Sequence, residues 1–80
     1  MITKTLTETC GKFWVVKASR INYDDKTVQI GLVAYESQAD LDADKLCHRD
    51  SITVPSAGYK GTVAWCETAL KSDSNSKLKS

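Results

Sequence analysis

Residues 12–36, KFWVVKASRINYDDKTVQIGLVAYE, decide the fold of this chain. Two segments rich in β-branched and aromatic residues flank an Asn/Asp cluster at 22–25, which is typical of a β-hairpin. The second segment has apolar residues with a two-residue period, at Val28, Ile30, Leu32 and Ala34. In the first segment residues 13–16 are all apolar, so both strand faces carry apolar side chains. Such a hairpin buries one face in its own core and offers the other to something else.

The hairpin is expected to have strands over 12–21 and 27–36 with a turn over 22–26. A two-residue turn at Asp24 and Asp25 pairs Ile21 with Val28, and a three-residue turn over 23–25 shifts the register by one. The second register is favoured because it forms one apolar face, with Trp14, Val16 and Ala18 beside Ala34, Leu32 and Ile30.

The N-terminal residues alternate as well. Threonine occupies every odd position from 3 to 9, and its branched Cβ favours extended backbone. Residues 2–9 are therefore expected to form a strand or an extended arm, and Gly11 separates them from the hairpin.

Three further elements are expected after the hairpin. Ser37, followed by Asp40, predicts an N-capped helix of one or two turns. Residues 46–54 predict a third strand, which ends at Pro55 because proline cannot donate to the ladder.

A closing helix is expected over about 58–71, with Ser56 as its N-cap. Its apolar stripe comprises Tyr59, Val63, Cys66 and Leu70. Residues 72–80 are polar and low in complexity, and they are expected to form a flexible tail in the free protein.

These elements predict an α+β fold, in which an antiparallel sheet of three to four strands has one C-terminal helix packed on a face. The chain divides into an N-terminal strand or arm over 1–11, a single domain over 12–71 and a tail over 72–80.

The composition excludes several classes of function. Lys and Arg number 11 against 10 Asp and Glu, and no basic block interleaves with aromatic residues, so nucleic-acid binding is not expected. No apolar run is long enough for a signal peptide or a membrane span, which predicts synthesis in a reducing cytoplasm. The three cysteines cannot all pair within one chain, so free thiols are expected.

Cys10, Cys47, His48 and Cys66 supply the ligand types of a zinc site, but their spacing argues against one. Structural zinc sites use a Cys-x2–4-Cys knuckle, which this chain lacks. Cys47 and His48 are adjacent on a strand and therefore point to opposite faces. Asp40, Asp42 and Asp44 resemble the start of a calcium loop, but Lys45 and Leu46 follow where oxygen ligands are needed. No metal site or cofactor is expected.

A catalytic site is not expected either. His48, Asp50 and Ser51 are hydrolase residue types, but near neighbours on one strand cannot converge on a substrate, and no Gly-x-Ser-x-Gly elbow is present.

Partner contacts are expected from apolar side chains outside the domain core. Aromatic residues are enriched in interface cores, and an alternating arm can pair with a neighbour's sheet. The candidate partner-binding residues are Ile2, Leu6, Phe13, Trp14 and Tyr35.

The strings WVVKASRI at 14–21 and KTVQIGLVAYESQADLDADK at 26–45 resemble the small structural proteins of tailed bacteriophages. The resemblance covers about residues 12–70, and it carries no functional residue to transfer. It implies a non-enzymatic subunit of the virion, in the tail, baseplate, neck or capsid-decorating layer. Such a subunit is made in the host cytoplasm and binds other virion proteins or copies of itself, with no small-molecule substrate and no membrane.

The alternative function is a small phage-encoded inhibitor that binds and occludes a host or defence protein. One apolar face on a monomer suffices for this role. Near-neutral charge argues only against inhibitors that mimic DNA, which need a strongly acidic surface.

Overall fold

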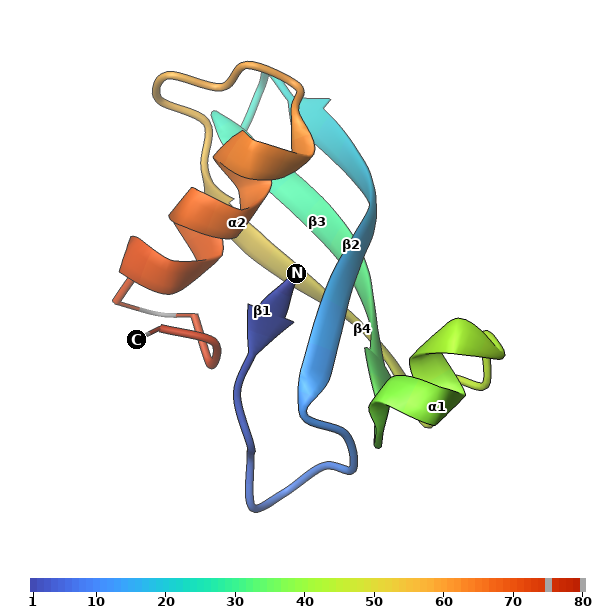
Figure 1. Ribbon diagram of the computed structural model, residues 1–80. Coiled ribbons are helices and arrows are strands. Elements are labelled where there is room, and N and C mark those ends of the chain that lie inside the picture. Colours follow the sequence, from blue (N-terminus) through green and yellow to red (C-terminus); the bar gives the residue numbers. More distant parts are fainter. Residues whose placement is uncertain (75, 80) are drawn as a thin grey trace.

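A computed structural model of the chain describes residues 1–74 and 76–79. It contains a four-stranded antiparallel sheet whose strands are neighbours in chain order, with one helix across a face and a shorter helix at its end (Figure 1). The predicted α+β class is thereby confirmed. The elements are β1 (Ile2–Thr3), β2 (Phe13–Asn22), β3 (Thr27–Tyr35), α1 (Gln38–Asp42), β4 (His48–Pro55) and α2 (Val63–Ser72).

The core lies between the sheet and α2. The even-numbered residues of β3 face it and are at most 2% exposed, as the two-residue period predicts. Ile52 and Val54 of β4 lie beside them, and Cys66 and Leu70 of α2 close the layer. Residues from all four strands, from α2 and from the C-terminal segment contribute to this core.

Both predicted hairpin registers occur in the structure. Near the turn Ile21 pairs with Val28, whereas at the far end Trp14 pairs with Ala34. A register shift between Val16 and Ala18 joins the two parts, as a β-bulge does when it inserts one extra residue in a strand. The predicted pairing of Ala18 with Ile30 is wrong, because the bulge moves Ala18 to Gly31.

The two helices differ in how well their starts were predicted. For α1, Ser37 is the N-cap and its side chain accepts from the Asp40 N–H, as expected. The start of α2 at 58 with Ser56 as cap is wrong: the helix begins at Val63, and Thr62 caps it by accepting from the Trp65 N–H at 3.1 Å.

Two glycines explain the later start of α2. Gly58 and Gly61 both have positive φ, 76° and 70°, which is incompatible with a right-handed helix. As a consequence Val63 is the first helical residue and is 55% exposed, so its predicted place in the buried stripe is also wrong.

The N-terminus is part of the sheet. Ile2 pairs with Trp14 and is 3% exposed. The Lys4 N–H donates to the Lys12 carbonyl at 2.9 Å, and Trp14 Nε1–H donates to the Lys4 carbonyl at 2.9 Å. Of the two predicted forms, a strand or a free arm, this structure has the strand.

The C-terminal residues that the structure describes do not form the expected flexible tail. Leu78 is fully buried in the hydrophobic core and Ser76 is 6% exposed. The Leu78 N–H donates to the Ser76 hydroxyl at 3.1 Å. Leu78 is the one apolar residue of the segment 76–79, and its side chain packs in the core with residues of the sheet and of α2.

Leu78→Ala is expected to lower the free energy of unfolding by about 2–5 kcal/mol, since it removes a fully buried side chain. Chemical denaturation followed by circular dichroism measures the change. Lys79→Ala is the matched control, because the neighbouring side chain is exposed. Equal stability of the two variants would contradict the burial of the C-terminal segment.

Candidate functional site

The structure places three of the five predicted partner-binding residues inside the molecule. Ile2, Trp14 and Tyr35 are 3%, 1% and 2% exposed. They present no surface to a partner in this conformation, which contradicts their predicted role as partner-binding residues. Leu6 packs partly against the core, and Phe13 is half-buried on the opposite face. The sequence did not show that the chain's own ends cover Trp14.

Tyr35 instead holds a loop in place. Its hydroxyl donates to the Asp44 carboxylate at 2.5 Å, and Asp44 has a positive φ of 56°. This hydrogen bond, together with burial and the negative charge of Asp44, raises the pKa of Tyr35. The loop before β4 is thereby tied to the end of β3.

Three side chains that could bind a metal ion lie close together and are called the thiol–carboxylate cluster: Cys10, Glu36 and Cys47. The sulfur atoms and a carboxylate oxygen all lie within 4.8 Å of one another. Cys10 comes shortly before β2, Glu36 follows β3 directly, and Cys47 directly precedes β4. The antiparallel order of the strands brings these three positions to the same end of the sheet.

The backbone around the cluster is fixed by hydrogen bonds. The Gly11 N–H donates to Glu36 Oε1 at 2.9 Å, and the Cys47 N–H donates to the Ala34 carbonyl at 2.9 Å. The Lys12 N–H donates to the Tyr35 carbonyl at 3.0 Å. The loop that carries Cys10 is thus attached to the exit of β3.

Gly11 allows this close approach. It is buried, its φ is +93°, and an added Cβ would lie 2.6 Å from the Ala34 Cβ and 3.0 Å from the Cys47 sulfur. Only a residue without a side chain adopts this backbone conformation in this space.

The environment of Cys47 favours its neutral thiol. The residue is exposed as a whole, but partial burial of its sulfur raises the pKa of Cys47 to about 12, assisted by the Cys10 hydrogen bond and the Glu36 charge. A raised pKa favours the protonated form in the folded state. The stability it contributes is therefore present below pH 9 and is lost as the pH rises toward 12.

With no metal added, Cys47 of the folded chain is expected to react with iodoacetamide at pH 8 at least about tenfold more slowly than Cys47 of the chain unfolded in urea. The reason is that the thiolate is the nucleophile, and the fold disfavours it. Peptide mass spectrometry after timed quenching measures the rate at this cysteine. Equal rates in the folded and unfolded chain would show that the cluster does not restrain this thiol.

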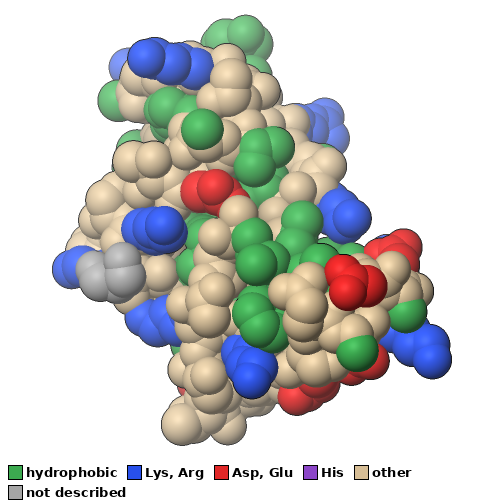
Figure 2. All heavy atoms as spheres, in the orientation of Figure 1, with side chains coloured by type: hydrophobic (Ala, Val, Ile, Leu, Met, Phe, Trp, Pro, Cys, Tyr) green, Lys and Arg blue, Asp and Glu red, His purple; other side chains and the backbone are tan. Residues whose placement is uncertain are grey.

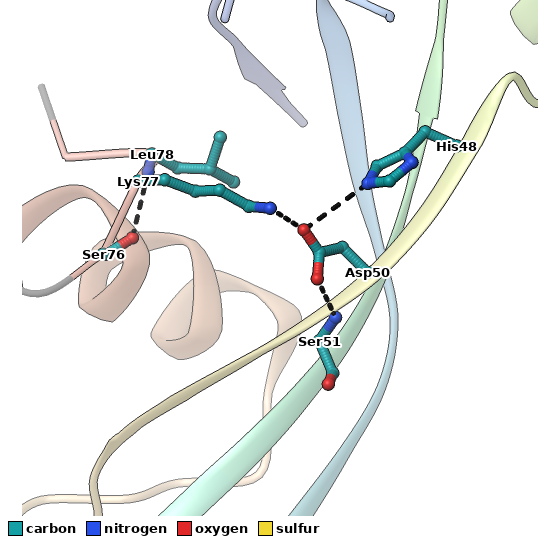
Figure 3. Close-up of polar contacts among 6 residues, drawn as sticks. All are labelled: His48, Asp50, Ser51, Ser76, Lys77 and Leu78. Carbon is teal, nitrogen blue, oxygen red and sulfur yellow. Dashed lines mark hydrogen bonds and ion pairs between the residues drawn. The ribbon is translucent and has the colours of Figure 1, made fainter. Parts of the chain in front are cut away.

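A second polar group, the Asp50 cluster, joins β4 to the C-terminal segment (Figure 3). The Lys77 ammonium contacts the Asp50 carboxylate, and His48 Nε2 lies 3.5 Å from it. The rings of Trp14 and His48 are nearly perpendicular, and their centroids are 6.0 Å apart. The Lys77 ammonium nitrogen lies 5.9 Å from the centroid of the Trp14 ring. Through these contacts of Lys77, the Asp50 cluster connects the segment that carries Leu78 to β4 and β2.

Ser51 lies next to the Asp50 cluster and contacts it through its backbone. Its backbone N–H, not its hydroxyl, contacts Asp50, and its hydroxyl accepts from Gln29 Nε2 at 3.3 Å.

The surface along β2 has a different character. Apolar side chains run down the middle of the molecule between α2 and α1 (Figure 2). A groove of about 180 Å³ lies between β2 and the start of α2, and Val16, Ala18 and Val63 supply its apolar walls. The sequence offered no signal for this groove, which depends on the bulge and on the late start of α2.

Comparisons of the chain with protein-family models, with curated proteins and with solved structures find no match. Neither helix of the described residues is long and apolar enough to cross a membrane.

Proposed function

We propose that this chain is a non-enzymatic structural subunit of a tailed-phage virion that binds its neighbours through the outer edge of β2. The proposal joins the resemblance carried by residues 14–45 to one structural observation. That observation is an exposed strand edge beside an apolar groove.

The edge of β2 is mostly uncovered. β2 has ten residues, and β1 pairs only with Phe13 and Trp14. Among residues 1–74 and 76–79, no strand pairs with the outer edge of β2 from Val15 to Asn22. Eight residues span about 27 Å, as long as a complete strand. A free edge of this length is a template for an added strand from another chain.

The groove supplies side-chain selectivity next to this edge. Strand addition obtains affinity from main-chain hydrogen bonds and specificity from pockets for alternate side chains. The groove is lined by Val16, Ala18 and the exposed Val63, so it suits one aliphatic side chain of the incoming strand. The favoured partner is an extended segment of a neighbouring virion subunit.

Charges on β2 restrict which strands can pair. Lys17 and Arg20 are exposed on this strand, and the register shift lies at Lys17. Charged residues and bulges on an edge strand oppose indiscriminate pairing. They favour an incoming strand that carries acidic residues, because opposite charges on adjacent strands stabilise the pair.

Mass spectrometry of purified particles of the phage that encodes the chain tests the proposed function. The chain is expected in a fixed ratio to the major capsid protein after the particles are separated from host lysate. Its absence from the particles would contradict the proposal and favour the inhibitor of a host or defence protein, which needs no virion.

Val63→Glu is expected to reduce incorporation of the chain into particles at least about tenfold, because it places an unpaired carboxylate in the apolar joint. The folded monomer is expected to keep its stability, since Val63 is exposed and an acidic residue suits a helix N-terminus. Complementation of a phage that lacks the gene, followed by quantitative mass spectrometry of the particles, measures the effect.

Ala64→Glu is the matched control for this experiment. Ala64 is exposed and is the next residue of the same helix turn, but it does not line the groove. Both variants add the same charge at the same helix end. Equal incorporation of the two variants would show that the groove is not the joint.

A further inference from the structure

We propose that Cys10, Glu36 and Cys47 bind a zinc ion. This inference does not depend on the proposed function, because it concerns a different part of the surface and a different ligand. The sequence alone argues against zinc, since no two cysteines are close in the chain. The fold brings together a set of ligands that the spacing did not reveal.

The distances within the cluster suit a zinc ion after small side-chain movements. Tetrahedral zinc has Zn–S bonds of about 2.3 Å and Zn–O bonds of about 2.0 Å, which separates its ligand atoms by roughly 3.5–3.8 Å. In the structure the three atoms lie within 4.8 Å of one another. Closing the site therefore requires movements of about 1 Å or less at the ends of side chains, and exposed Cys10 and Glu36 have the freedom to make them.

The ligand set itself selects zinc over harder cations. Thiolates bind zinc and copper(I) strongly, whereas magnesium and calcium require oxygen ligands. One carboxylate with two thiolates gives three protein ligands, and zinc sites with three protein ligands keep a fourth position open. Among the described residues, the only group of metal-ligand side chains this close comprises Cys10, Glu36 and Cys47. His48 is not part of this group and contacts Asp50. Water or a group from another molecule would occupy the fourth position.

The surrounding backbone prepares the site. The Gly11 N–H donates to Glu36 Oε1 at 2.9 Å, which orients the carboxylate and leaves its second oxygen for a metal. Hydrogen bonds of this kind raise metal affinity by fixing a ligand's direction. Gly11 itself has the conformation and the absent Cβ that allow Cys10 and Cys47 to approach.

Zinc binding requires no oxidant. Each thiol transfers its proton to the solvent as a Zn–S bond forms, and the oxidation states of sulfur and zinc do not change. Two neighbouring thiols can also be oxidised to a disulfide, and the experiment distinguishes this outcome by keeping a reductant present.

Titration of the reduced full-length chain with Co²⁺ and then Zn²⁺ tests the site. One equivalent of Co²⁺ is expected to give a thiolate-to-cobalt charge-transfer band in the near ultraviolet, and Zn²⁺ is expected to remove it by displacement. Competition with a chromogenic chelator measures the zinc affinity. Cys10→Ser and Cys47→Ser are each expected to abolish the band, and Glu36→Gln is expected to weaken zinc binding at least about tenfold.

Cys66→Ala is the matched control, because Cys66 is the third cysteine and lies on α2 with its side chain buried in the core. It is expected to leave the cobalt band and the zinc affinity unchanged. Circular dichroism shows that each variant is folded before its metal binding is compared. A band that survives in Cys10→Ser, or a reduced wild-type chain that binds zinc no better than Cys10→Ser, overturns the proposal.

Discussion

One constraint shapes this molecule: the apolar face of β3 is longer than α2, the helix that packs on it. The nine residues of β3 span about 30 Å, whereas the ten residues of α2 span about 15 Å. A helix of this length covers roughly half of the strand. The remaining half is covered by Ile2 from β1, Trp14 from β2 and Leu78 from the C-terminal segment. Because the helix is short, the domain buries Ile2 and Leu78, side chains from opposite ends of the described chain.

The two chain ends are also fastened to the rest of the domain. The N-terminal ammonium contacts Glu67 of α2, and the Lys4 ammonium contacts the Lys79 carbonyl. The first is an ion pair and the second a hydrogen bond, and an exposed ion pair contributes little stability by itself. Their effect is to keep Ile2 and Leu78 over the sheet, where apolar burial supplies the larger free energy.

Local sequence patterns predicted which helices and strands form better than they predicted the strand register and the start of α2. The period over β3 and the Ser37 cap were sufficient for the hairpin and α1. The register was ambiguous because the bulge between Val16 and Ala18 satisfies one pairing at each end of the hairpin. The start of α2 was missed because Ser56 looks like a cap, whereas Gly58 and Gly61 adopt positive φ. Whether a glycine adopts that conformation depends on tertiary contacts.

The candidate sites were less predictable than the fold, for a physical reason. Partner-binding residues were chosen for being apolar, but Ile2, Trp14 and Tyr35 are the side chains that the domain itself buries. The thiol–carboxylate cluster depends on Cys10 and Cys47, which are far apart in the chain and meet only because β2 and β4 flank β3. Periodicity reports which face a residue lies on, but it does not report which strand ends meet.

The proposed zinc site and the proposed strand edge both lie next to β1, which has only two residues. So short a strand has few hydrogen bonds to hold it, and terminal strands of this kind can exchange between copies of a chain. If β1 left β2, the free edge would extend to Phe13 and the core would lose Ile2. A metal on Cys10, Glu36 and Cys47 would fasten the connection between β1 and β2 to the ends of β3 and β4, and would thereby keep β1 in its own chain. The edge from Val15 onward then stays defined, so an incoming strand meets one register and a smaller entropy cost of ordering.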